Sequence, residues 1–186
     1  MLTALQALDL HLVVLATHFL AMYSWLDRPV YAAADLLVVL YPLTLYVLWR
    51  MPHTPQRFGS RKAVIIALVS LAVSLSIKTF ITFVWVRSRP YVVDPSVLFT
   101  SFSLEPESFP SGHTLVATTI AASLYYSGYR KLGSVLLVGA VLIGVARIMS
   151  GIHYPSDVLG GLVIGMGVAA YLHREASTLR HYLPDH

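Results

Sequence analysis

A histidine and an aspartate in the last quarter of the chain have a spacing suited to nucleophilic chemistry. His153 and Asp157 lie four residues apart, on either side of Pro155. Because proline is favoured at the first helical position, we expect His153 just before a helix and Asp157 in its first turn. A carboxylate placed there can hydrogen-bond one ring nitrogen and leave the other free to attack. A purely structural His–Asp cap is the alternative.

A second histidine follows Pro110-Ser111-Gly112, which closes a polar loop and opens an apolar segment. Ser111 and Gly112 can leave backbone N–H groups unpaired at a helix N-terminus, where the helix dipole attracts an anion. His113 would stand in the first turn beside that anion and could protonate a leaving group, a role worth ~10²–10⁴ in rate. An ordinary helix cap is the competing interpretation.

Three cations could hold the anion. Arg89 and Arg147 carry guanidinium groups, which bind phosphate oxygens through two parallel hydrogen bonds. Either arginine could instead be an interfacial side chain or half of an ion pair, although Arg147 lies near the end of an apolar segment, where charge is costly. Lys78 lies deeper in its segment and either extends past Thr82 towards the same anion or pairs with Asp35.

Two histidines with separate roles and a cationic cradle are sufficient for phosphoryl transfer without a metal. The sequence has no dense carboxylate cluster beside them for Mg²⁺, and it has no HExxH or P-loop motif. The absence of cysteine excludes thiolate metal sites and disulfides. We therefore expect no metal and no other cofactor, and we interpret His11 and His18 as interfacial residues.

The composition places these residues in a membrane protein. Of the 186 residues, 56% are hydrophobic and 12% are charged, against ~25% charged in soluble domains, and the mean hydropathy is +0.69. We expect one domain, residues 1–186, with about five or six membrane spans. The net charge of +4 comes from short basic clusters between apolar runs, which is a topology signal and not a nucleic-acid footprint. No cleavable signal peptide is visible.

The expected fold is an all-α, polytopic membrane helix bundle. The first apolar segment, Ala4–Trp25, contains Asp9 and either spans poorly or lies along the interface. The cleaner spans are Pro29–Trp49, Ala63–Val86, His113–Tyr129, Leu132–Met149 and Pro155–Leu172. The loop Arg87–Gly112 is long enough to be functional. Gly161 and Gly165 have the small-residue spacing of closely packed helices.

Positive charge predicts the orientation of the bundle. Basic residues gather in the connections on one side, which the positive-inside rule makes cytoplasmic: Arg50, Arg57, Arg61, Lys62, Arg130, Lys131, Arg174 and Arg180. The loop 87–112 and the link Ser150–Tyr154 fall on the opposite side. Arg89, the run 111–113, Arg147 and His153 are scattered in the sequence but should meet at this outer face.

In these residues the chain resembles the type 2 phosphatidic acid phosphatase superfamily. The resemblance rests on three motifs, in order, within about Lys78–Leu172: Arg89-Pro90, Pro110-Ser111-Gly112-His113 and Arg147-x5-His153-x3-Asp157. It implies a six-helix membrane bundle and metal-independent hydrolysis through a phosphohistidine. His153 would be the nucleophile, Asp157 its orienting carboxylate, and His113 the general acid and later the base for water. The phosphate would be held by Arg89, Ser111, Gly112 and Arg147.

Two positions depart from the family pattern. The lysine usually found seven residues before the arginine of the first motif is Thr82 here, while Lys78 lies one helical turn earlier on the same face, which leaves its phosphate role open. The serine usually preceding the arginine of the third motif is Ala146. The short chain, the weak first helix and the run Arg-Ser-Arg-Pro-Tyr from residue 87 are most similar to the bacterial undecaprenyl diphosphate phosphatases of this superfamily.

The sequence therefore predicts an integral phosphatase of the bacterial cytoplasmic (inner) membrane, with its site facing out of the cytoplasm. Its expected partners are the bilayer and a lipid phosphate or diphosphate. The preferred reaction is undecaprenyl diphosphate to undecaprenyl phosphate, as in the recycling of the cell-wall lipid carrier. Phosphatidylglycerophosphate, phosphatidate and the phosphates of lipid A are alternative substrates.

Two other classes of protein compete with this prediction. A lipid-binding or transport protein would need the cations but no oriented nucleophile, so the complete His–His–Asp set argues against it. Vanadate haloperoxidases share the motifs, but they are typically soluble, and the apolar composition disfavours them. The sequence does not indicate an oligomeric state.

Overall fold

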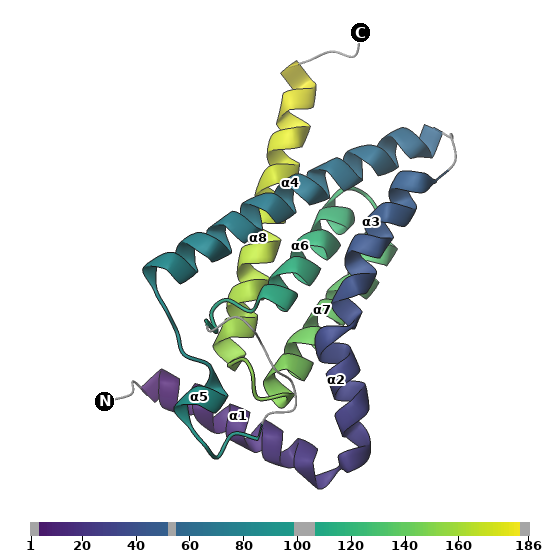
Figure 1. The fold of residues 1–186 in the computed structure, drawn as a ribbon. Helices are drawn as coiled ribbons and strands as arrows, with labels where there is room; N and C mark the ends of the chain where they lie inside the picture. Colours follow the sequence, from purple (N-terminus) through teal and green to yellow (C-terminus); the bar gives the residue numbers. More distant parts are fainter. Residues whose placement is uncertain (1–3, 52–54, 99–106, 183–186) are drawn as a thin grey trace.

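The fold is that of a computed structural model, which describes residues 4–51, 55–98 and 107–182 (Figure 1). Within these ranges the chain is helical, and its only β-type pairing is an isolated antiparallel bridge between Ser88 and Glu107. The predicted all-α membrane bundle is confirmed. Part of the long loop, residues 99–106, lies outside the described residues.

Five of the helices are long and apolar enough to cross a membrane, counting the broken N-terminal pair as one. The described helices are α1 (Ala4–Met22), α2 (Asp27–Asp35), α3 (Leu40–Arg50), α4 (Pro55–Val84), the single turn α5 (Pro90–Val93), α6 (Gly112–Tyr126), α7 (Arg130–Met149) and α8 (Pro155–Tyr182). A 3₁₀ turn, Leu37–Val39, joins α2 to α3, so that the two together form one span.

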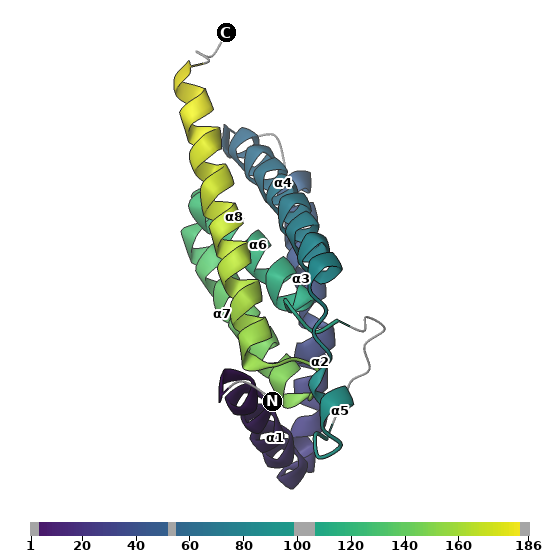
Figure 2. The same cartoon turned by 90° about the vertical axis from the view of Figure 1, so that its left-hand side faces the viewer.

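The helix α6 is shorter than predicted and lies at the centre of the bundle. It has 15 residues and ends at Tyr126, before a turn in which Gly128 has a φ of +98°. Ten of its side chains are buried, because α4, α7 and α8 surround it (Figures 1 and 2). A helix enclosed in this way meets protein and not lipid, so it does not need the ~20 apolar residues of an isolated span.

Close packing of α8 against α6 depends on glycine. A Cβ added at Gly161 would lie 2.9 Å from the carbonyl oxygen of Ser111, and one added at Gly165 would lie 3.0 Å from the Cβ of Thr118. A side chain at Gly161 would force a shift of the α6 backbone, and one at Gly165 would press on Thr118 and Thr119, so the predicted close packing at this pair is confirmed. The close approach brings the N-terminal turns of α6 and α8 together.

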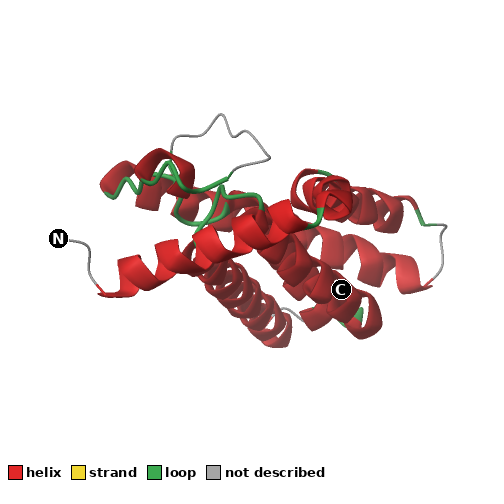
Figure 3. Cartoon of the chain, turned by 90° about the horizontal axis from the view of Figure 1, so that it is seen from below, coloured by secondary structure: helices red, strands yellow, loops and turns green. Residues whose placement is uncertain are grey.

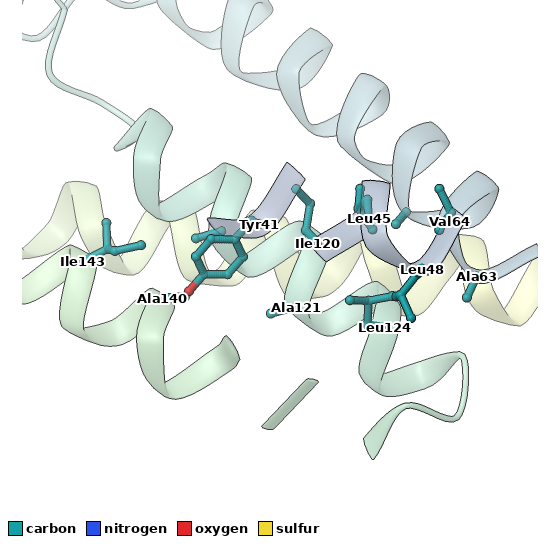
Figure 4. Close-up of a cluster of buried hydrophobic side chains, with 12 residues drawn as sticks. Tyr41, Leu45, Leu48, Ala63, Val64, Ile120, Ala121, Leu124, Ala140 and Ile143 are labelled. Carbon is teal, nitrogen blue, oxygen red and sulfur yellow. The ribbon is translucent and has the colours of Figure 1, made fainter. Parts of the chain in front are cut away.

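A buried apolar cluster holds α3, α4, α6 and α7 together (Figure 4). Leu45 of α3 and Ile120 and Leu124 of α6 are at its centre. Tyr41 also enters the cluster, and its hydroxyl donates to the carbonyl oxygen of Leu136 at 2.7 Å. Because lipid tails are as apolar as leucine, these side chains contribute mainly through tight packing and not through escape from water.

The first helix lies across one end of the bundle. Figures 1 and 2 show α1 below the junction of α7 and α8, and the view from below in Figure 3 shows it crossing the other helices. Its buried face includes Val13, which packs with Val97 and Tyr154. By length and hydropathy α1 could span a bilayer, but this placement favours the second prediction for the segment, a helix that lies along the interface.

The two ends of the bundle differ in charge. The end opposite α1 carries the basic residues Arg50, Arg61, Lys62, Arg130 and Lys131, because α3 ends there and α4 and α7 begin there. The end covered by α1 receives the last turn of α7 and the first turns of α6 and α8. The described part of the chain therefore has the separation of basic clusters from motif residues that the sequence predicted.

Candidate active site

His153 lies in the link between α7 and α8, and its side chain is 2% exposed. The link reverses the chain through Gly151, which has a φ of +75°. The Nε2 atom of His153 lies 3.4 Å from Nη1 of Arg89, and its Nδ1 atom lies 3.5 Å from Oδ2 of Asp157. One ring nitrogen therefore faces a carboxylate and the other faces a cation, as a nucleophile between an orienting group and a phosphate site requires.

The Asp157 carboxylate is fully buried and held from three directions. Oδ2 accepts hydrogen bonds from the Ser108 hydroxyl at 2.5 Å and from the Tyr154 backbone N–H at 2.8 Å. Oδ1 accepts one from Nη1 of Arg87 at 2.7 Å. With its oxygens held in this way, Asp157 presents a charge of fixed orientation to His153.

Burial lowers the pKa of His153 to about 4. The Asp157 carboxylate opposes this shift, whereas the charges of Arg147 and Arg89 add to it. The imidazole is therefore neutral at physiological pH, and one of its ring nitrogens keeps a free lone pair.

Arg89 is 1% exposed and lies beside His153. It stands just before α5, and its Nη1 donates to the carbonyl oxygen of Ile152 at 2.9 Å. Pairing across the loop fixes the segment that carries it, since Ser108 N–H donates to the carbonyl oxygen of Arg87 at 2.8 Å. The arginine of the first motif thus reaches the third motif.

Arg147, in the last turn of α7, is 3% exposed and forms an ion pair with Asp35 at the end of α2. Of the alternatives predicted for this arginine, the structure shows an ion pair, and its charge also acts on His153. The same contact gives the Asp35 carboxylate a partner from α7.

The N-terminus of α6 differs in part from the prediction. The Ser111 N–H, expected to point at an anion, donates instead to the carbonyl oxygen of Asp157 at 3.1 Å. The Ser111 hydroxyl lies 3.0 Å from Oγ1 of Thr114 and makes no capping bond, so the ordinary side-chain cap is also wrong. Gly112 and His113 occupy the first two helical positions, and the N–H of Gly112 has no acceptor within the helix.

Lys78 reaches this helix terminus from α4. A Cβ added at Gly112 would lie 3.3 Å from Cε of Lys78 and 3.9 Å from its Nζ. The expected path of the lysine side chain towards the anion site is therefore present, although the lysine lies one helical turn from the family position. The absence of a side chain at Gly112 leaves the space that the lysine occupies.

Comparisons with known proteins agree with this geometry. Residues 63–180 match the PAP2 superfamily. The chain is 33% identical over 164 residues to undecaprenyl-diphosphatase BcrC of Bacillus subtilis, covering 86% of this chain and 80% of the relative. The chain belongs to the PAP2 superfamily. It is thus an integral membrane enzyme of the phosphatase type, a hydrolase of phosphate esters or anhydrides.

Two further PAP2 relatives are similar over most of their length. The putative undecaprenyl-diphosphatase YbjG of Escherichia coli is 36% identical over 137 residues, which are 74% of this chain and 66% of the relative. The crystal structure of Aquifex aeolicus LpxE superposes with a TM-score of 0.68 at 30% identity, covering 90% of this chain and 95% of that one.

Three side chains in this PAP2 site were not assigned a role there from the sequence. Arg87 and Ser108 both bind Asp157, and Asp9 of α1 binds Arg87. A signal for Asp9 was present, because a carboxylate inside an apolar segment is costly unless it is paired. For Arg87 the signal was its position, two residues before Arg89 of the first motif.

The described part of the chain has no evident metal site, and His18 has a partner within its own helix. Across the described ranges, no group of three or more histidine, aspartate and glutamate side chains has the arrangement of a metal site. His18 is exposed, and its Nδ1 lies 2.8 Å from the carbonyl oxygen of Val14 in its own helix.

Proposed function

We propose that this PAP2 phosphatase removes the terminal phosphate of a lipid diphosphate, with undecaprenyl diphosphate as the substrate, through a phosphohistidine on His153. The observation that carries the proposal is the placement of the His153 ring, with Nε2 beside Arg89 and Nδ1 towards Asp157. Relatives named as undecaprenyl-diphosphatases, similar over most of this chain, support the substrate.

In the first half-reaction, Nε2 of His153 attacks the terminal phosphorus in line with the bridging oxygen. The P–N bond forms as the P–O bond to the bridging oxygen breaks, and that oxygen leaves with the lipid monophosphate. His113, in the first turn of α6, gives the leaving oxygen a proton where its basicity requires one. The Asp157 carboxylate stabilises the positive charge that develops on the imidazole.

In the second half-reaction, His113 removes a proton from a water molecule, whose oxygen attacks the phosphorus. The P–N bond breaks, inorganic phosphate leaves, and His153 returns to the neutral state. The cations of Arg89, Arg147 and Lys78 and the N–H of Gly112 hold the phosphoryl oxygens in both steps, because most of the catalysis of phosphoryl transfer is positioning and charge stabilisation.

The lipid tail would lie against the membrane-facing helices while the headgroup enters at the end of the bundle covered by α1. We place this end on the extracytoplasmic face of the cytoplasmic membrane, since the basic residues gather at the other end. Reaction at this face would return the lipid carrier as its monophosphate.

A phosphate-release panel in detergent tests the proposal. It compares undecaprenyl diphosphate, phosphatidylglycerophosphate, phosphatidate and lipid A, with His153→Ala as the blank. We expect the highest kcat/KM with undecaprenyl diphosphate, no turnover above the blank for His153→Ala, and activity that survives EDTA. A preference for one of the other lipids would reassign the substrate, whereas full activity of purified His153→Ala would overturn the mechanism.

A further inference from the structure

An ionic network connects the catalytic carboxylate to the first helix. Arg87 is at its centre: Nη1 donates to Oδ1 of Asp157 at 2.7 Å and to the Ser156 hydroxyl at 2.6 Å, and Nη2 donates to Oδ2 of Asp9 at 2.7 Å. The guanidinium also lies 3.9 Å from the ring centroid of Tyr154. Arg87 is therefore fixed on several sides.

Asp9 closes this network from α1. Its side chain is 6% exposed. Besides the Arg87 guanidinium, its carboxylate accepts the Ser156 hydroxyl and, at 3.1 Å, the Ser156 backbone N–H in the first turn of α8. Asp9 lies outside residues 63–180, the part of the chain that matches the superfamily. A segment beyond the common PAP2 core thus contacts the helix turn that carries Asp157.

We propose that Asp9 and Arg87 are positioning residues for Asp157, an inference that rests on the proposed phosphohistidine reaction. Arg87 holds Oδ1, which leaves Oδ2 directed at His153. Without Asp9, Arg87 would move closer to the Asp157 carboxylate. Its positive charge would then weaken the attraction between Asp157 and the imidazolium that forms on His153 during attack. Asp9 prevents this by sharing the arginine charge, so α1 contributes to the rate although it does not touch the substrate.

Asp9→Asn tests this role, because it keeps the shape of the side chain and removes its charge. By analogy with residues that orient metal ligands, whose loss costs ~10–100-fold in activity, we expect kcat to fall by about that factor, with KM within about twofold of wild type. Ser156→Ala is a milder change in the same network. We expect kcat to fall roughly threefold to tenfold, since the hydrogen bonds of its hydroxyl with Arg87 and Asp9 are lost while the Arg87–Asp9 ion pair remains.

Asp94→Asn is the matched control, because Asp94 is a carboxylate at the same end of the bundle that hydrogen-bonds Ser96 and not this network. Its kcat and KM should equal those of wild type. The positioning role is wrong if both network variants have the kcat of the wild type, whether their KM is unchanged or raised. A wild-type enzyme inactive on every lipid of the panel would instead count against the proposed function, so the two failures are distinguishable.

A second inference comes from a cavity at the opposite end of the bundle. It has a volume of about 260 Å³ and lies between the start of α4, the turn after α6 and the last part of α8. Its polar lining comes from Lys62, Ser127, His173 and Ser177. In Figure 1 the start of α4 and the last part of α8 lie at the end of the bundle opposite α1, so the cavity is separate from the active site.

Two buried polar atoms that belong to residues of this lining have no hydrogen-bond partner among the described residues. They are the Ser127 hydroxyl and Nδ1 of His173, whose ring stacks on Tyr126. Leaving such an atom unpaired costs ~1–3 kcal/mol, so a ligand that supplies the missing partner is stabilised there. Lys62 provides a positive charge, and no carboxylate belongs to the described lining.

We propose that this cavity binds the phosphate group of an anionic phospholipid. Basic pockets between transmembrane helices on the cytoplasmic side are suited to such headgroups. Arg61, next to Lys62, lies over the Trp49 ring at 5.1 Å, and tryptophan is common at membrane interfaces. A phosphate here would accept hydrogen bonds from Lys62, Ser127 and His173, and it would connect α4 to α8.

Thermal unfolding in detergent tests this site without reference to turnover. Phosphatidylglycerol added to the micelles should raise the Tm of the wild type and of His153→Ala by roughly 2–4 °C, and phosphatidylcholine should not. Lys62→Gln should remove most of the shift, whereas Lys131→Gln, an exposed cation at the same end outside the cavity, should keep it.

Equal shifts with the two lipids, or equal losses in the two lysine variants, would show a general charge effect and overturn the site. A third arm uses inorganic phosphate. If millimolar phosphate produces the shift and Lys62→Gln removes it, the cavity takes the free anion, and the assignment to a lipid headgroup is wrong.

Discussion

Arg147 and Asp35 form an ion pair between α7 and α2, although 112 residues separate them in the chain. The arginine is 3% exposed and the aspartate 23% exposed. The pair gives the N-terminal helices a second polar attachment to the site end, beside that of Asp9 and Arg87. Arg147 acts electrostatically on His153 and Arg87 binds Asp157, and both carboxylates come from the segment before the family core.

Breaking this pair should destabilise the fold. For Asp35→Ala we expect a loss of about 2–3 kcal/mol in the free energy of unfolding, below the ~3–5 kcal/mol of a fully buried pair because Asp35 keeps some solvent contact. Chemical denaturation in mixed micelles measures the change. Asp27→Asn is the control in the first turn of the same helix, with an expected cost of no more than ~1 kcal/mol. Equal losses would mean that the ion pair contributes nothing specific.

Replacing His113 should affect the second half-reaction more than the first. With a diphosphate substrate the leaving group is itself a phosphate, which needs little protonation, but water still needs a base. We expect His113→Ala to reduce kcat by ~10²–10⁴ and to accumulate the phosphoenzyme. Acid-labile, alkali-stable ³²P bound to His113→Ala, and absent from the double variant with His153→Ala, would report this. A slow variant that carries no label would indicate that its first step is limiting.

The acid limb of the rate profile should reflect the low pKa of His153, about 4. Protonation removes the lone pair of Nε2, so kcat/KM should fall as the pH decreases through about 4, and not through the ordinary ~6.5. Phosphate release between pH 3.5 and 8 measures this. A fall centred near 6.5 in the wild type would contradict the neutral, buried nucleophile.

The same shift has a consequence for stability. Between pH 6.5 and about 4 the unfolded chain binds a proton at this histidine that the folded chain does not, so stability rises with pH across that window. The favourable contribution of the neutral ring is complete above pH 6.5 and is lost as the pH falls to about 4. His153→Gln should flatten the unfolding free energy in that window, and an unchanged slope would argue against this account.

The contact of α8 with α6 should tolerate no side chain at Gly161. The alanine Cβ would lie 2.9 Å from the Ser111 carbonyl oxygen and 3.1 Å from the Leu115 nitrogen. We expect Gly161→Ala to lose about 1–3 kcal/mol of stability, and kcat to fall because these helices carry His113 and Asp157. Gly167→Ala, on the same helix with nothing within 4 Å of the added Cβ, should be neutral or more stable by up to ~1 kcal/mol. Similar unfolding curves for the two variants would exclude this packing role.

Several features of the site follow from local sequence. Pro155 places His153 before α8 and Asp157 in its first turn, and hydropathy with charge brings the motif residues to one end. These predictions succeeded because they depend on residues that are adjacent in the chain or on the thickness of a bilayer. The family pattern then assigned roles to His153 and Asp157 that agree with their positions at the start of α8.

Tertiary structure decided the rest, including the hydrogen bonds at the N-terminus of α6. The Ser111 N–H binds the Asp157 carbonyl oxygen, and the contact exists only because Gly161 lets the two helices approach closely. The partners of Asp9 and Asp35 lie 78 and 112 residues away. A sequence shows that a charge in an apolar segment needs a partner, but only the packed helices determine which partner comes within hydrogen-bond distance.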